Sequence, residues 1–154
     1  MGITYTVPNT LHITYGDTFG YYASVRERMK EMATHFRNLK FLVRHHDNKD
    51  LMLSQINKAI QNPDIYMWAH AGHGWNGDVE LKNNLKYKPS DFTPIYKLYK
   101  VIIYSCYAAR KKQGWLKHVA TGGVFMGSTE RLFPGRSLTR LFVTDWYDLP
   151  VYKK

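Results

Sequence analysis

Short β-prone segments alternate with helical patterns along almost the whole chain, and this alternation restricts the possible folds more than any other feature of the sequence. Apolar or alternating runs predict five strands, at residues 11–15, 41–45, 65–69, 101–105 and 124–127. Apolar side chains at steps of three and four predict helices at residues 22–36, 52–60, 90–99, 114–121 and 137–146. Such alternation favours an α/β fold, a three-layer sandwich around a mostly parallel sheet.

Two local patterns refine this prediction. Asn76 and Gly77 are a strong two-residue turn signal and predict a small hairpin over residues 75–81. The run VIIYS at residues 101–105 is apolar almost throughout, which is typical of a strand buried on both faces of a parallel sheet. The sequence has no linker, repeat or low-complexity segment, so we expect residues 1–154 to form a single domain.

The composition is that of an ordinary globular protein, with 44% hydrophobic and 22% charged residues. The net charge of +10 suggests a basic nucleic-acid-associated protein as one alternative. However, the basic residues are spread, only residues 110–112 form a tight cluster, and no nucleic-acid-binding motif is present. We therefore do not expect nucleic acid as a partner.

The sequence also bears on the compartment. It has no run of the roughly 18 apolar residues that a membrane helix needs, and its first residues lack a signal-peptide pattern. Cys106 is the only cysteine, so no internal disulfide can form, which fits a reducing compartment. We expect a cytoplasmic protein with no membrane contact, no cofactor and no bound metal.

Two reactive side chains follow predicted strands. The strand at residues 65–69 continues into the segment AHAGHG, which contains His73, and the strand at residues 101–105 is followed by Cys106. Functional groups collect at the carboxyl ends of strands in open parallel sheets. If the two strands are neighbours, His73 and Cys106 lie at the same edge.

This pair of motifs resembles the caspase-hemoglobinase fold of cysteine peptidases, which includes caspases, metacaspases, gingipains, clostripain and CHAT-domain proteases. AGHG at residues 71–74 is similar to the SGHG block of metacaspases, and VIIYSC at residues 101–106 resembles a strand of CHAT domains. GGVFMGSTE at residues 122–130 resembles the next strand of that fold. The chain looks like a minimal member, and its YSCYA differs from the Gln-Ala-Cys signature of caspases, so strict specificity for aspartate is not expected.

The resemblance implies a cysteine endopeptidase that acts on a protein or peptide substrate. Cys106 would attack the scissile carbonyl, and His73 would protonate the leaving amine and later help to activate water. The backbone N–H groups of Gly74 and Cys106 would form the oxyanion hole.

The resemblance also suggests which residues hold the substrate. Glu130, in the segment GSTE, stands where metacaspases place an acidic residue that holds a basic side chain before the cut. Tyr104 replaces their second acid, and Ser128 lies in the same segment as Glu130. The expected specificity is therefore cleavage after basic residues, through a pocket formed by Glu130, Tyr104 and Ser128.

Other interpretations of these residues stay open. A non-catalytic binding module could keep the same fold. His70, His73 and Cys106 could together bind zinc, although the sequence offers no convincing fourth ligand. We otherwise expect His70 to be a packing residue or a support for the site, and one of His45 and His46 to be structural.

Overall fold

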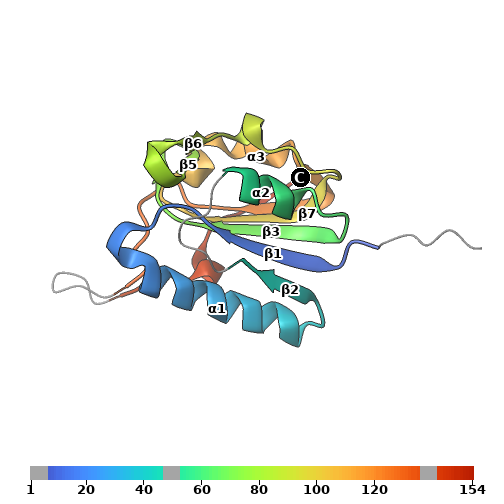
Figure 1. Ribbon diagram of the computed structural model, residues 1–154, viewed down its shortest axis with the longest axis horizontal. Helices are drawn as coiled ribbons and strands as arrows, with labels where there is room; N and C mark the ends of the chain where they lie inside the picture. Colours follow the sequence, from blue (N-terminus) through green and yellow to red (C-terminus); the bar gives the residue numbers. More distant parts are fainter. Residues whose placement is uncertain (1–6, 47–52, 136–141) are drawn as a thin grey trace, which may run out of the picture.

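A computed structural model describes residues 7–46, 53–135 and 142–154. Within these residues a central sheet has six strands in the order β2-β1-β3-β7-β8-β9, all parallel except the last, which is antiparallel to β8 (Figure 1). Its strands are β1 (Thr10–Tyr15), β2 (Leu42–His45), β3 (Ile65–Ala71), β7 (Leu98–Tyr104), β8 (Val119–Met126) and β9 (Val151–Lys153). The predicted α/β class with a mostly parallel sheet is therefore confirmed.

Few helices accompany this sheet. Helix α1 (Tyr22–Asn38) lies on one face, and α2 (Leu53–Ile60) and α3 (Lys112–Leu116) lie on the other (Figure 1). A small antiparallel sheet of β4 (Gly74–Trp75), β5 (Asp78–Glu80) and β6 (Lys86–Tyr87) also lies on the α2 side.

Both faces of the central sheet are covered by apolar side chains. Successive strand side chains point to opposite faces, so Leu11 and Ile102 pack in the cluster beneath α1, whereas Trp68 and Ile103 pack in the cluster beneath α2 and α3. This double burial explains the uninterrupted apolar run at residues 101–104, as predicted for a parallel strand.

The predicted hairpin at residues 75–81 is confirmed by β4 and β5. Asn76 and Gly77 have φ angles of 51° and 96°, as a two-residue type I′ turn requires. A Cβ atom on Gly77 would also lie 2.3 Å from the Lys111 Cγ atom. Glycine therefore serves both the turn and the close approach of the segment that follows Cys106.

The helix predicted at residues 90–99 is wrong. Pro89–Asp91 form one 3₁₀ turn, η3, and β7 begins at Leu98. Pro94 has no N–H to donate within a helix, and its ring disfavours helical backbone before it. Phe92 instead turns inward and stacks on Trp68, with ring centroids 4.6 Å apart.

The helix predicted at residues 114–121 is wrong in its second half, because α3 ends at Leu116 and β8 begins at Val119. The predicted strand at residues 124–127 is thus only the end of a longer one. Val119 is fully buried and pairs with Leu98. Gly123 follows so close to the Tyr99 carbonyl oxygen that a Cβ atom there would lie 2.3 Å away. Packing against β7 therefore outweighs the helical pattern.

The helix predicted at residues 137–146 falls partly outside the described residues, since residues 136–141 are not described. Residues 142–145 are not helical, and η5 (Trp146–Asp148) is a 3₁₀ turn. The backbone here bonds to other segments, because the Thr144 N–H donates to the Phe133 carbonyl oxygen. Phe142 is 63% exposed, so it does not form part of an apolar stripe facing the core.

Candidate functional site

Three parallel strands end level with one another. The register pairs Tyr15 of β1 with Ala71 of β3, and Ala71 with Tyr104 of β7. From one edge of the central sheet, the parallel strands are β2, β1, β3, β7 and β8. The chain proceeds outward from β1 to β2 on one side and from β3 to β8 on the other, so the strand order reverses between β1 and β3. Ligands bind outside the carboxyl ends of strands at such a switch point. The segments after β1, β3 and β7 therefore meet where a site is expected.

A pocket of ≈ 260 Å³ lies at this edge, and both His73 and Cys106 line it. Thr18 and Tyr21, from the segment after β1, and residues 131–135, from the segment after β8, complete much of its wall. The structure thus brings together the two residues that the sequence singled out.

His73 is held by backbone bonds on both sides. Its N–H donates to the Asp17 carbonyl oxygen at 2.7 Å, and its carbonyl oxygen accepts from the Glu80 N–H at 2.8 Å. Its ring meets the ring of Tyr21 edge-on, with centroids 6.2 Å apart. The imidazole therefore has a defined position between the segment after β1 and the small sheet.

Cys106 is half-buried, and its sulfur lies close to a backbone donor. The Leu132 N–H is 3.2 Å from Cys106 Sγ, and such a donor stabilises negative charge on sulfur. Tyr107 has a φ of 64°, and its N–H donates to the Glu130 carbonyl oxygen at 3.0 Å. This left-handed residue turns the chain sharply just after the thiol.

Gly74 brings the His73 segment against the Cys106 backbone. A Cβ atom on Gly74 would lie 2.2 Å from the Cys106 carbonyl oxygen and 3.1 Å from its nitrogen, so no other residue fits without displacement. The bond from the Glu80 N–H to His73 makes Gly74 and Val79 a non-hydrogen-bonded pair, so the Gly74 N–H points away from β5. The Cys106 N–H has no acceptor in the described part of the chain.

The three residues expected to hold the substrate are not brought together. Tyr104 lines the pocket, and its hydroxyl donates to the Thr144 carbonyl oxygen. Burial raises the pKa of Tyr104, so the phenol stays a neutral donor. Ser128 is buried and accepts from the Glu130 N–H at 2.9 Å, while the Glu130 side chain is exposed, and neither residue lines the pocket.

Residues 131–135 line the pocket in place of Ser128 and Glu130, and the sequence did not predict this. Leu132, Phe133 and Pro134 all line the pocket. A signal was present, because this apolar run directly follows the polar segment GSTER, which begins at the carboxyl end of a predicted strand.

His70 belongs to the interior. Its Nδ1 atom lies 2.9 Å from Thr14 Oγ1, which also accepts from Trp68 Nε1–H. Complete burial lowers the pKa of His70 to about 3, so the ring is neutral at physiological pH. Among the residues that the structure describes, no group of three or more His, Cys, Asp and Glu side chains is arranged to hold a metal ion.

The two histidines at the end of β2 lie elsewhere. His45 bonds to the Tyr15 hydroxyl, and His46 Nε2 lies 3.0 Å from His12 Nδ1. His12 in turn bonds to Asp64. Neither His45 nor His46 lines the pocket, so both support the β1–β2 side of the sheet.

Comparison with protein-family models finds no match, and comparison with curated proteins finds none either. What the site can do chemically is therefore inferred from the positions of its residues.

In the described ranges, no helix combines the length and apolarity needed to cross a bilayer.

Proposed function

We propose that the protein is a caspase-like cysteine endopeptidase in which Cys106 is the nucleophile and His73 the general acid and base. The observation that carries this proposal is that both side chains line one pocket at the ends of neighbouring parallel strands. A thiol and an imidazole in one accessible cleft are the minimal pair for acyl transfer through sulfur. The half-buried sulfur with a backbone donor fits a nucleophile better than a core thiol.

In this mechanism the Cys106 thiolate attacks the scissile carbonyl carbon, and the carbonyl π electrons move to oxygen. The backbone N–H groups of Gly74 and Cys106 bind that oxyanion, and such donors contribute roughly 10²–10³-fold each. The C–N bond then breaks as the His73 imidazolium protonates the leaving amine. Finally, His73 takes a proton from water, which attacks the thioester and releases the acid product, leaving the Cys106 thiolate and the His73 imidazolium for the next cycle.

The test combines thiol labelling with cleavage of an unfolded protein such as denatured casein. We expect iodoacetamide to label Cys106 of the folded protein at neutral pH faster than that of the urea-unfolded chain, and His73→Ala to slow this labelling. Cys106→Ala and His73→Ala should each abolish cleavage while circular dichroism stays unchanged, because nucleophile and acid act as one unit. His35→Ala, which alters an exposed histidine on α1, should keep wild-type cleavage.

Several outcomes would contradict the proposal. Cleavage retained in Cys106→Ala would exclude Cys106 as the nucleophile. A folded protein without cleavage, whose thiol reacts no faster than in the unfolded chain, would favour a non-catalytic module. Nucleic-acid binding that falls steeply with salt, again without cleavage, would favour a basic nucleic-acid-associated protein.

A further inference from the structure

The pocket beside Cys106 has the size of one side-chain site. Its volume of ≈ 260 Å³ is below the roughly 300–1,000 Å³ typical of pockets for drug-sized ligands. Apolar or aromatic side chains contribute much of its wall: Tyr21, Val25, Tyr104, Leu132, Phe133 and Pro134. Three hydroxyl residues also line it: Thr18 and Ser105, which are almost completely buried, and Ser24, which is half-buried. The surface offered to a ligand is more apolar than polar.

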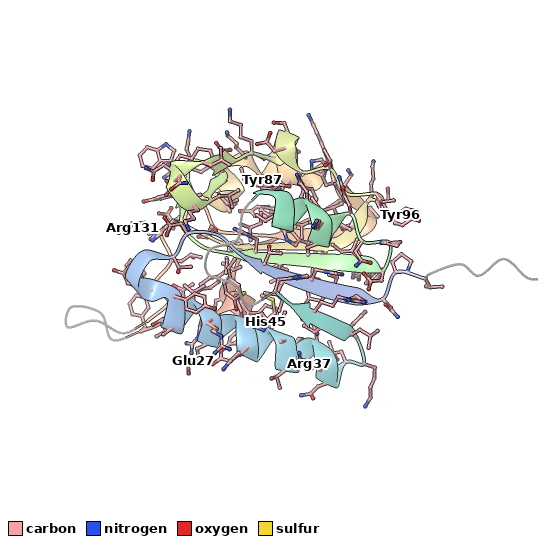
Figure 2. The ribbon with its side chains drawn as sticks, viewed as in Figure 1. Glu27, Arg37, His45, Tyr87, Tyr96 and Arg131 are labelled. Atoms are coloured by element: carbon pink, nitrogen blue, oxygen red, sulfur yellow. The ribbon has the colours of Figure 1, made fainter. Side chains whose placement is uncertain are left out.

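The charge of the pocket is positive. Arg131 is the one Asp, Glu, Lys or Arg residue in the described lining, and it is exposed. Figure 2 shows Arg131 at the edge of the molecule where α1 begins, which is also the edge that holds the pocket. No described carboxylate lines the pocket to pair with a bound lysine or arginine, and an unpaired cation is costly to bury.

The backbone after β8 explains why Glu130 does not supply that carboxylate. The Glu130 N–H donates to Ser128 Oγ, and its carbonyl oxygen accepts from the Tyr107 N–H. The first bond fixes the shape of residues 128–130, and the second holds them against the turn after Cys106. The Glu130 side chain is left exposed, and the next residues, from Arg131 onwards, reach the pocket.

We infer that this pocket selects a large apolar side chain, such as leucine or phenylalanine, in the residue whose carbonyl group Cys106 attacks. The inference rests on the peptidase function proposed above and replaces the sequence-based expectation of cleavage after basic residues. An apolar side chain gains free energy by leaving water and meets no unpaired charge in the pocket.

The experiment uses peptidyl acyloxymethyl ketones, in which the thiolate displaces the acyloxy group as a C–S bond forms. The probes differ only in the side chain beside the reactive ketone: Leu, Phe, Ala, Lys or Asp. Alkylation of Cys106 is followed by intact mass, so no turnover is needed. We expect the Leu and Phe probes to react about 10-fold faster than the Ala probe, because apolar pockets discriminate roughly 10–200-fold per methylene. The Lys and Asp probes should react more slowly than the Ala probe.

Two variants sharpen the test. Arg131→Glu should raise the rate with the Lys probe about 10-fold, because it replaces repulsion with attraction at the pocket. Arg37→Glu makes the same charge change at an exposed residue toward the other end of α1 and should leave all the rates unchanged (Figure 2).

The outcomes separate the two proposals. If the protein cleaves casein through Cys106 but the Lys probe reacts fastest, or all probes react equally, the apolar pocket is overturned and the peptidase stands. A preference for Asp would overturn it in the same way and assign Arg131 as the anchor. If no probe alkylates Cys106 and casein is not cleaved, both proposals fail. An unchanged Lys rate in Arg131→Glu would exclude Arg131 from the pocket that substrates enter.

Discussion

The Nζ atom of Lys111 lies 2.7 Å from the Oδ1 atom of Asp78, and this ion pair joins the segment after Cys106 to the hairpin after His73. The Asp78 side chain is 10% exposed and that of Lys111 39%, so the pair is partly shielded from water. It is therefore placed to fix the separation of the two proposed catalytic side chains.

Lys111→Met should loosen that connection. Leaving the Asp78 carboxylate unpaired should destabilise the fold by about 1–3 kcal/mol, and small displacements of a catalytic group can cost up to about 10²-fold in rate. We expect lower stability in urea and slower alkylation of Cys106, whereas Lys117→Met, an exposed position after α3, should change neither. Equal effects of the two substitutions would show that the ion pair has no positioning role.

Gly74→Ala tests the close approach of the His73 segment to Cys106. The new methyl group would meet the Cys106 carbonyl oxygen at 2.2 Å, so one backbone must move. Overpacking of this kind costs about 1–3 kcal/mol, and we expect a lower melting temperature together with a large loss of cleavage. Gly20→Ala is the matched control, because a Cβ atom there has no atom within 4 Å. A Gly74→Ala variant with wild-type cleavage would contradict the proposed oxyanion hole.

Tyr104→Phe tests the anchor between β7 and residues 142–145. The substitution removes the bond to the Thr144 carbonyl oxygen, and leaving this part-buried acceptor without a partner should cost about 1 kcal/mol. Tyr147→Phe removes a hydroxyl bond to Asp145 from an exposed residue and should cost less. Chemical unfolding of both variants measures the difference, and equal costs would argue against an anchoring role for Tyr104.

The stability of the protein should fall as the pH drops below about 6.5. Burial lowers the pKa of His70 to about 3 and also lowers the pKa values of His12 and His46. Between these values and the unfolded pKa of about 6.5, the unfolded chain binds protons that the folded chain does not, so folding weakens by about 1.4 kcal/mol per pH unit for each such histidine.

Urea unfolding at pH 7, 6 and 5 of the wild type and His70→Leu measures this dependence. The variant should lose about one histidine's share of the pH slope, whatever its stability at pH 7. A slope that His70→Leu leaves unchanged would show that His70 does not titrate in this way.

The sequence predicted the parts of the fold in which local pattern and tertiary packing agree. The apolar steps of α1 face the sheet, with Val25, Met29 and Phe36 buried, and the run at residues 101–104 is buried on both faces. His73 and Cys106 could be placed together because the ends of parallel strands share an edge. None of these predictions required knowledge of a distant contact.

The failures arose where long-range contacts decide the structure. At residues 90–99 the burial of Phe92 against Trp68 outweighs the helical spacing. Val119 joined a strand because Leu98 offers it a partner, and β9 was missed because a three-residue strand carries almost no periodic signal. The pocket wall at residues 131–135 depends likewise on how the chain leaves β8, which the pattern of side chains does not specify.

The site is assembled from segments that are far apart along the chain. Thr18, His73, Cys106 and Leu132 line one pocket, and each follows a different strand of the same sheet. Pairings of this kind are slow to form, because the loops between the strands must close first, and a chain is synthesised from its N-terminus. A growing polypeptide therefore carries its only thiol before the pocket wall at residues 131–135 exists, and whatever chemistry the site performs begins only when the residues after β8 have folded onto it.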